Sequence, residues 1–348
     1  MNKKYLNVFM ISAVFLMLFT PLVSNQVVNA AIVQSISLTK SGLIVSDPLN
    51  NETKTQQQLQ SNPRYWTYGG DAIALKAPYA FFKDTRGLHI GVQSPGNSTY
   101  AGFYAVTPST NALLYHVILT TPVRTIPSQG IITSDTFQNG LYVQTTQAPV
   151  NYVTCFSITN NQKTVWSILH TYGTPFGSVV FDTLWTDPSQ NQPLTRECTI
   201  ITNGQNYLKV YLDGVMVYSN KLLALGMPAP FNAFLEPQNS YRGQLINATF
   251  TDFYMTANET IQIIKNPSNA KTVTVTSSSG AILASAPVSN GNATVDVGKY
   301  HFPLAANIHV YDSSNTLIAS TSSFVNIFGG NVYSVNPLDL SENYVNQH

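Results

Sequence analysis

The side chains with the clearest potential for chemistry are aromatic and imidazole rings, since a ring offers a large stacking face at low entropic cost. The candidate ligand contacts are Trp66, Tyr68, Trp166, His170, Trp185 and Tyr211. Trp166 and His170 share one face of a strand expected at residues 164–172. Such rings could stack on the apolar faces of sugars while neighbouring polar groups bind hydroxyls. The alternative for each ring is packing within a sheet, where Tyr and Trp are favoured.

The acidic residues indicate no catalytic pair. Asp182 and Asp187 are five positions apart, which places them on opposite faces of a strand. The chain has no His-Glu-x-x-His, no Gly-x-Ser-x-Gly and no phosphate loop, and no two of its six histidines have ligand spacing. We therefore predict no catalytic residue.

Two cysteines and five sequons bear on covalent modification. Cys155 and Cys198 either form a disulfide, which an extracellular location would permit, or stay as two buried thiols. The Asn-x-Ser/Thr motif, the acceptor for N-glycosylation in secreted proteins, occurs at Asn51, Asn97, Asn247, Asn258 and Asn292.

The N-terminus predicts secretion. Lys3 and Lys4 precede an apolar run at residues 6–23, and Val28-Asn29-Ala30 resembles a cleavage site, so residues 1–30 are expected to be a signal peptide. The alternative is an uncleaved membrane anchor. No second apolar stretch is long enough to span a bilayer. Only 9% of residues are charged and the net charge is +1, without a basic stripe, so nucleic acid is not an expected partner.

The rest of the chain reads as short strands separated by turn residues, which predicts an all-β sandwich or barrel. Expected strands include residues 88–94, 101–107, 112–119, 140–146, 151–159, 164–172, 178–186 and 197–202. A polar N-terminal segment is expected at 31–63, a first β domain at 64–260, a smaller immunoglobulin-like β-sandwich at 268–338 and a tail at 339–348. No convincing helical period follows the signal peptide.

Residues 206–220, NYLKVYLDGVMVYSN, predict a hairpin with a two-residue turn at Asp213-Gly214. In this register Leu212 faces Val215, Tyr211 faces Met216, and earlier pairs continue without a shift. The five residues expected to face the core are Leu208, Val210, Leu212, Val215 and Val217. The opposite Tyr/Lys face is either a solvated surface or a platform for a ligand.

This hairpin, followed by FNAFLEPQNS and GQLINATFTDFYM, resembles the end of concanavalin A-like (laminin G-like) jelly-roll domains. The resemblance covers residues 64–258 and implies two curved antiparallel sheets, with a concave face where members of the fold commonly hold glycans. Laminarinase-type glycosidases of this fold carry a Glu-x-Asp-x-(x)-Glu strand, which is absent from this sequence. Alginate-lyase-like members carry a Gln-x-His element, whereas in LHIGVQS the His precedes the Gln. Some laminin G-like relatives also bind calcium, which takes oxygen ligands from loops. For such a site the candidate ligands in this sequence are Asp71, Asp187 and Asp213.

The second domain resembles small modules of secreted and cell-surface proteins. The low charge, the abundant Thr, Asn and Tyr, and the sequons together resemble the composition of an archaeal surface protein, so an archaeal source is expected.

Three functional hypotheses follow. The first is a secreted, non-catalytic protein whose partner is a glycan or a cell-envelope component. The second is a polysaccharide-acting glycosidase or lyase with an unrecognised active site. The third is a structural subunit of a surface layer or filament, in which strand edges pair between chains. Paired carboxylates in the concave groove would favour the enzyme, whereas aromatic and amide side chains alone would favour binding.

Overall fold

The structure is a computed structural model that describes residues 33–62, 64, 66–95, 100–122, 135–159, 164–174, 177–189, 192–221, 224–241 and 243–337. The predicted signal peptide and tail, and the sequon at Asn97, lie outside the described residues. Within the described ranges no helix is long and apolar enough to cross a membrane. Two short helices occur, α1 (Gln56–Ser61) and α2 (Asp71–Ala74). Nearly all other regular structure is strand, which confirms the predicted all-β class.

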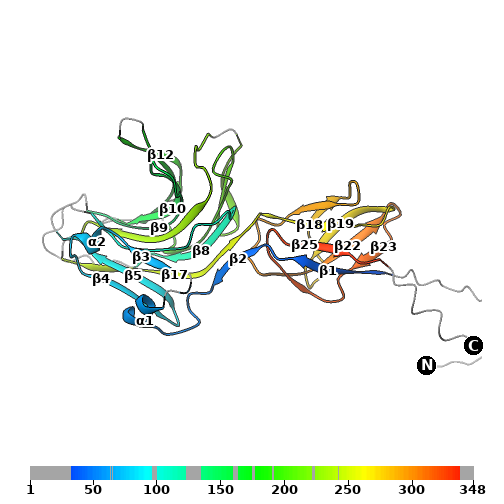
Figure 1. The fold of residues 1–348 in the computed structure, drawn as a ribbon, viewed down its shortest axis with the longest axis horizontal. Coiled ribbons are helices and arrows are strands. Elements are labelled where there is room, and N and C mark those ends of the chain that lie inside the picture. The colour runs from blue at the N-terminus through cyan, green and yellow to red at the C-terminus, as the bar shows by residue number, and fades with distance from the viewer. Residues whose placement is uncertain are drawn as a thin grey trace, which may run out of the picture. The chain divides into compact units, whose positions relative to one another are not determined.

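Two antiparallel sheets form the first part of the fold, and Figure 1 shows them as two layers. We call one the groove sheet; its order is β12 (Val179–Thr186), β11 (Thr164–Gly173), β10 (Asn151–Thr159), β9 (Phe137–Thr145), β16 (Phe231–Asn239), β7 (Tyr104–Val106) and β3 (Thr67–Gly69), with β6 (Ala101–Gly102) also paired to β16. The other, the back sheet, has the order β15 (Val215–Asn220), β14 (Leu208–Leu212), β13 (Thr195–Thr202), β8 (Leu114–Thr120), β17 (Leu245–Thr256), β5 (Gly87–Gln93) and β4 (Tyr79–Asp84), with β2 (Leu43–Asp47) also paired to β17.

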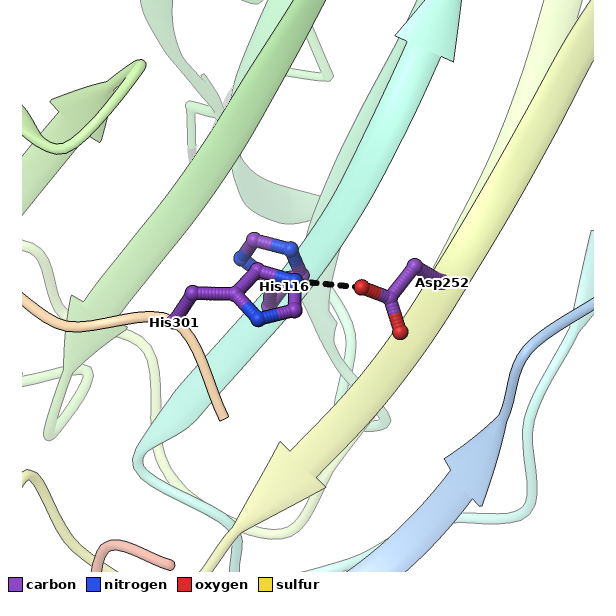
Figure 2. Close-up of side chains that lie close together, drawn as sticks. All are labelled: His116, Asp252 and His301. Carbon is purple, nitrogen blue, oxygen red and sulfur yellow. Dashed lines mark hydrogen bonds and ion pairs between the residues drawn. The ribbon is translucent and has the colours of Figure 1, made fainter. Parts of the chain in front are cut away.

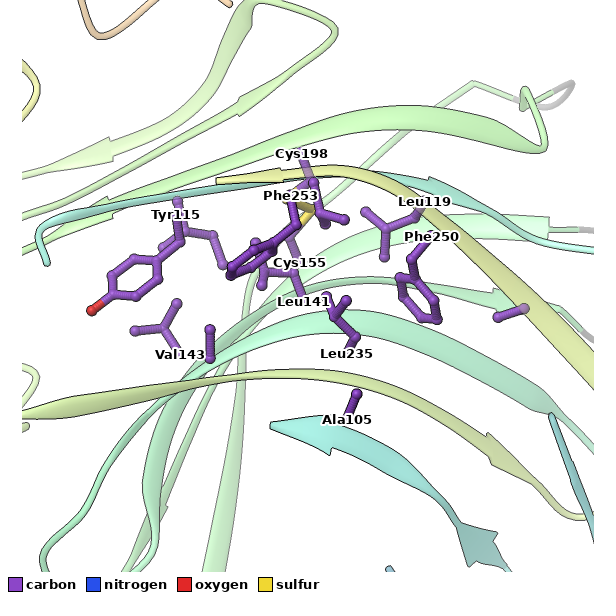
Figure 3. Close-up of a cluster of buried hydrophobic side chains, with 14 of the residues drawn as sticks. Ala105, Tyr115, Leu119, Leu141, Val143, Cys155, Cys198, Leu235, Phe250 and Phe253 are labelled. Atoms are coloured by element: carbon purple, nitrogen blue, oxygen red, sulfur yellow. A yellow bond between two sulfur atoms is a disulfide. The ribbon is translucent and has the colours of Figure 1, made fainter. Parts of the chain in front are cut away.

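A continuous apolar core fills the space between these two sheets. Leu141 and Leu235 enter it from the groove sheet, and Leu119 and Phe250 enter it from the back sheet, all of them fully buried (Figure 3). One covalent bond crosses the core: a disulfide joins Cys155 of β10 to Cys198 of β13, with their Cα atoms 6.6 Å apart. Of the two alternatives for the cysteines, the structure shows the disulfide.

The strand boundaries expected from alternation agree with the structure to within a few residues in the sandwich. The strand at 151–159 coincides with β10, and those at 164–172 and 178–186 correspond to β11 and β12. The structure differs from the prediction in the polar segment, where no helix is expected but α1 forms with Thr55 as its N-cap. Its side chain accepts a hydrogen bond from the Gln58 backbone amide, and the Gln58 side chain accepts one from the Thr55 amide. This reciprocal cap stabilises a helix end that apolar periodicity does not reveal.

The hairpin of β14 and β15 follows the predicted register only near its turn. Asp213 and Gly214 both have positive φ, at 52° and 72°, as a type I′ turn requires. Leu212 pairs with Val215 and Tyr211 with Met216, but a bulge then shifts Val210 opposite Tyr218.

The bulge and the position of β15 at the sheet edge change which of these side chains are buried. Leu208, Val210 and Leu212 are buried as expected, whereas Val217 is only partly buried. The expectation that Val215 faces the core is wrong, since this side chain is 65% exposed.

The strands after Thr260 form a further set together with β1 (Gln34–Lys40), and we call it the C-terminal strand set. Its order is β20 (Ile282–Pro287), β19 (Ala270–Thr276), β22 (Leu304–Asp312), β23 (Leu317–Ser320), β1, β25 (Val332–Val335), β18 (Thr260–Ile264) and β21 (Ala293–Asp296), with β24 (Val325–Ile327) paired to β22. Thus the polar N-terminal segment expected at 31–63 contains β1 and β2, and β18 precedes the expected start of the second domain at 268. An immunoglobulin-like topology for this set stays a prediction.

Candidate functional site

The groove sheet carries a polar and aromatic groove on the face that points away from the core. The groove has a volume of about 470 Å³, within the usual range for ligand pockets. Its lining comprises Tyr100, Gln138, Tyr142, Tyr152, Thr154, Phe156, Ile158, Leu169, Phe181, Thr183 and Gln238. Strand alternation places these residues on the side opposite the buried Leu141, Val153 and Ile168.

Aromatic rings supply much of the apolar surface of the groove. Tyr142 and Tyr152 lie on neighbouring strands with ring centroids 5.4 Å apart in an edge-to-face arrangement. Tyr142 and Phe156 are almost fully buried by their neighbours, whereas Phe181 on the edge strand β12 is 62% exposed. Phe181 is therefore the aromatic side chain most available to stack on a ligand.

One carboxyl group, that of Glu236, lies on the same face of β16 as the groove residue Gln238. The Gln238 side-chain amide donates a hydrogen bond of 3.2 Å to Glu236 Oε1. The cross-strand neighbour of Glu236 on β9 is Gly140, where a Cβ atom would lie 2.7 Å from Phe156 Cβ, so Phe156 occupies the space above this glycine. Burial raises the pKa of Glu236 to about 7; the hydrogen bond from Gln238 opposes this shift and the charge of Asp71 adds to it.

Of the described residues that line the groove, none is an aspartate or glutamate. The two-carboxylate arrangement used by most glycoside hydrolases is therefore absent from the described lining. Glu236 lies beside the lining, and Asp71 is near enough for its charge to act on Glu236. The lining consists instead of aromatic, amide, hydroxyl and aliphatic groups, which can stack on and hydrogen-bond to an uncharged ligand.

Replacing Glu236 by glutamine should raise the free energy of unfolding by about 3 kcal/mol at pH 8, because each pKa unit corresponds to about 1.4 kcal/mol. The carboxyl ionises near pH 4.5 in the unfolded chain but near pH 7 in the folded one. Native stability should therefore fall as pH rises from about 4.5 to 7, stay reduced above that window, and show no such penalty below it. Urea unfolding at pH 5, 6, 7 and 8 measures this trend.

Glu52 provides the matched control for this substitution. Its side chain is 40% exposed, and a hydrogen bond from Lys54 lowers its pKa, so Glu52→Gln should not stabilise the protein at pH 8. If the native chain and Glu236→Gln lose stability in parallel between pH 5 and pH 8, Glu236 is not the group responsible.

Three of the predicted ligand contacts lie on β11 and β12 of the groove sheet and point to its core face. Trp166 is fully buried in the core and its indole donates a 2.9 Å hydrogen bond to the Pro193 carbonyl oxygen. His170 is buried, bonds through Nε2 to the Asn151 side-chain oxygen at 2.9 Å, and has a pKa lowered by burial. Trp185 is partly buried against the same core. The structure thus gives a ligand in the groove no contact with these three rings.

The other three predicted contacts are also engaged in packing. Trp66 meets Phe253 edge-to-face at 4.6 Å, and its indole donates to Asp47. Tyr68 is partly buried against the core beside Phe81 and Phe103. Tyr211 is buried in a cluster formed mainly by the C-terminal strand set. The Tyr/Lys face of the hairpin is therefore covered in part by protein.

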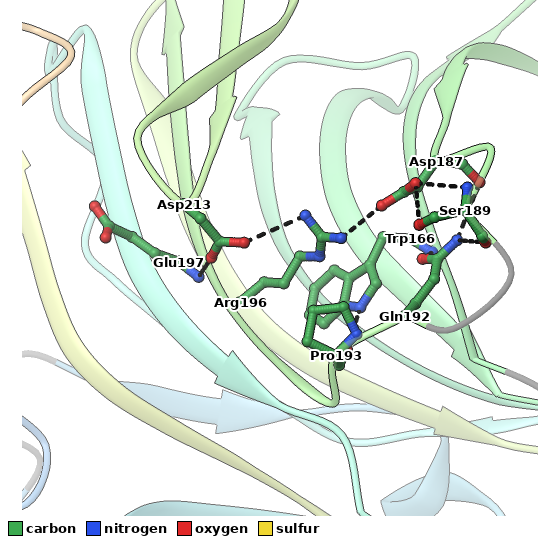
Figure 4. A network of polar contacts seen from close by, with 8 residues as sticks. All are labelled: Trp166, Asp187, Ser189, Gln192, Pro193, Arg196, Glu197 and Asp213. Atoms are coloured by element: carbon green, nitrogen blue, oxygen red, sulfur yellow. Dashed lines mark hydrogen bonds and ion pairs between the residues drawn. The ribbon is translucent and has the colours of Figure 1, made fainter.

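Two of the three predicted calcium ligands share an arginine instead. Arg196 binds Asp187 at 2.5 Å and Asp213 at 3.2 Å through its two terminal nitrogens, as Figure 4 shows. The guanidinium group supplies the positive charge between these carboxylates. Asp71 begins α2, and among the described residues it does not come together with Asp187 and Asp213 in a group that could hold one ion.

A cluster that sequence spacing did not reveal combines His116 of β8, Asp252 of β17 and His301 of the loop before β22 (Figure 2). The potential ligand atoms all lie within 4.8 Å of one another. Burial lowers the pKa of His116, whereas the hydrogen bond to Asp252 raises that of His301. No sequence motif links these residues, since 185 positions separate the two histidines.

Four of the five sequons lie in described residues. Asn51 and Asn292 are exposed, while Asn247 and Asn258 are partly buried. Asn51 and Asn292 are accordingly the more accessible of the four, and modification at any of them stays a prediction.

No protein-family model matches this chain, and no curated protein does. Among solved structures it is similar to β-agarase A from Zobellia galactanivorans (12% identity, TM-score 0.42, 62% of this chain and 93% of that one). It is also similar to a glycoside hydrolase family 16 endo-glucanase from Bacteroides ovatus (11%, 0.41, 61% and 99%) and to the carbohydrate recognition domain of Emp46p (12%, 0.40, 64% and 99%). Similarity at this level supports no inference about activity or ligand.

Proposed function

We propose that this chain is a secreted, non-catalytic protein that binds a neutral glycan in the groove of the groove sheet. The observation that carries the proposal is the composition of the groove, where rings and amides line about 470 Å³ and no described lining residue is acidic or basic. Sugar rings offer apolar faces for stacking and hydroxyls for hydrogen bonds. An uncharged polysaccharide matches this lining better than a sulfated or uronic chain, which would lack a cationic partner in it.

Secretion is part of the proposal and rests on two features. The leader-like sequence at residues 1–30 has the pattern of a signal peptide. The disulfide between Cys155 and Cys198 supports this part of the proposal, because disulfides are typical of proteins in oxidising compartments. N-terminal sequencing of the protein recovered from the culture medium tests this part, with cleavage after Ala30 as the expected result.

A glycan array followed by calorimetry with the best ligand tests the binding. Phe181→Ala should weaken that binding about tenfold, because it removes the most exposed ring of the groove. Phe324→Ala is the matched control, since Phe324 is 48% exposed and lies between β23 and β24, away from the groove lining. Equal affinities of the two variants, or no binding of any neutral glycan, would contradict the proposal.

The enzyme hypothesis is retained as a second candidate because of Glu236. A carboxyl group with a pKa of about 7 has the protonation behaviour of a general acid at neutral pH. A reducing-sugar release assay with the native chain and Glu236→Gln separates the two functions. Release that Glu236→Gln abolishes would establish hydrolysis, whereas binding without release supports the non-catalytic function.

A further inference from the structure

Three side chains with metal-ligating atoms converge from β8, from β17 and from the loop between β21 and β22 (Figure 2). We propose that His116, Asp252 and His301 form a binding site for one divalent transition-metal ion of the zinc class. The site is separate from the groove, because none of the three residues lines it. It would connect the back sheet to the C-terminal strand set.

His116 is oriented as a ligand and has one nitrogen without a partner. The ring is fully buried, and its Nδ1 hydrogen-bonds to the Thr199 hydroxyl at 2.8 Å. Its Nε2 has no hydrogen-bond partner, although buried polar atoms are nearly always paired. Metal-binding histidines typically hydrogen-bond through the nitrogen that does not bind the metal. Nε2 is therefore the atom available for an ion.

Asp252 owes its position to a bulge in β17. The pairing with β8 shifts between Thr251 and Tyr254, so β17 has one residue more than β8 between these two paired positions. Asp252 has a φ of 52°, and its backbone amide donates to the Pro48 carbonyl oxygen instead of to β8. Bulges re-aim side chains and are frequent beside functional sites. This bulge directs the carboxylate toward the two histidines.

His301 is placed by the residue that follows it. The Phe302 amide donates a 3.1 Å hydrogen bond to the Tyr254 hydroxyl, and the Tyr254 ring stacks on His116 with centroids 4.2 Å apart. One tyrosine thus positions both histidines. His301 Nε2 hydrogen-bonds to Asp252 Oδ2; an ion would replace the shared proton, and these two atoms would move to a separation of about 3.3 Å, as tetrahedral bonds of about 2.0–2.1 Å require.

The donor set indicates which metals would bind. Two imidazoles and one carboxylate suit Zn²⁺, Co²⁺ or Ni²⁺, whereas Ca²⁺ and Mg²⁺ prefer oxygen ligands alone. His301 is exposed, so water can fill the fourth position. The carboxylate of Glu197 lies 3.7 Å from His116 Nδ1 and adds negative charge beside the site.

Calorimetric titration of the untagged, EDTA-treated full chain with ZnCl₂ tests the proposal. The expected result is one ion per chain, with at least about 100-fold weaker binding by His301→Ala and by Asp252→Asn. Asparagine tolerates the left-handed backbone of position 252, so this variant removes a charged ligand while keeping the bulge. His309→Ala should bind like the native chain, because His309 hydrogen-bonds to Ser320 outside the cluster.

Thermal unfolding separates loss of the ligand from loss of the fold. In EDTA, His301→Ala and Asp252→Asn should unfold close to the temperature of the native chain, and Zn²⁺ should raise the midpoint of the native chain but not theirs. The proposal is overturned if the native chain takes up no stoichiometric Zn²⁺ at a tenfold excess. It is equally overturned if either variant binds the ion as tightly as the native chain does.

Discussion

A variant in which Cys155 and Cys198 are both replaced by alanine unfolds with a free energy about 4 kcal/mol lower than that of the native chain. The disulfide closes a loop of 43 residues, and the chain-entropy relation gives a loop of this length about that effect. The bond also joins β10 of the groove sheet to β13 of the back sheet through the centre of the core. Urea unfolding without reductant measures the difference.

Reduction of the native chain provides the control. In dithiothreitol the free energy of unfolding of the native chain should fall most of the way to that of the double-alanine variant. The free energy of unfolding of the variant itself should not change. Any difference that remains under reductant is the effect of the two missing sulfur atoms on core packing. Identical urea midpoints for the two proteins without reductant would show that the bond contributes nothing to stability.

The sandwich could be predicted from the sequence because its strands alternate and end at turn residues. The strand expected at 151–159 is β10, with Val153 and Cys155 facing inward. Two-residue alternation fails where a bulge inserts a residue. On a regular strand Phe250 and Tyr254 would lie on one face. They belong to different buried clusters here, because the bulge at Asp252 reverses the alternation.

The groove could not be predicted, for a related reason. Aromatic rings suit ligand contacts, yet large rings also fill a core between two sheets, and alternation alone does not say which face of a strand is inside. The residues of the groove, such as Tyr152 and Phe181, occupy the opposite face of the same strands. Tyr152 is partly exposed and the neighbouring Val153 is buried. This difference depends on which face of β10 the back sheet covers, and the sequence of the strand does not show that.

The histidine cluster could not be predicted from spacing. His116 and His301 come together only because the loop before β22 returns to the back sheet, where Tyr254 accepts a hydrogen bond from Phe302. Local patterns report on neighbours in the chain, whereas this site depends on contacts between strands distant in sequence.

Trp166→Ala should lower the free energy of unfolding by about 3–5 kcal/mol, the usual cost of removing a large buried aromatic side chain. The substitution leaves a cavity in the core and removes the hydrogen bond from the indole to the Pro193 carbonyl oxygen (Figure 4). Trp166→Phe retains much of the buried surface and should lose less. Denaturant unfolding of the three proteins gives this order directly.

The glycan affinity of Trp166→Ala shows whether Trp166 is a core residue or stacks on a sugar. Because Trp166 faces the core, the folded fraction of Trp166→Ala should bind a glycan about as tightly as the native chain, whereas Phe181→Ala should keep its stability and lose affinity. The opposite pattern, with Trp166→Ala stable but unable to bind, would place the indole in the ligand site. The two substitutions thus separate stability from recognition on neighbouring strands, since β11 and β12 carry these rings on opposite faces of one sheet.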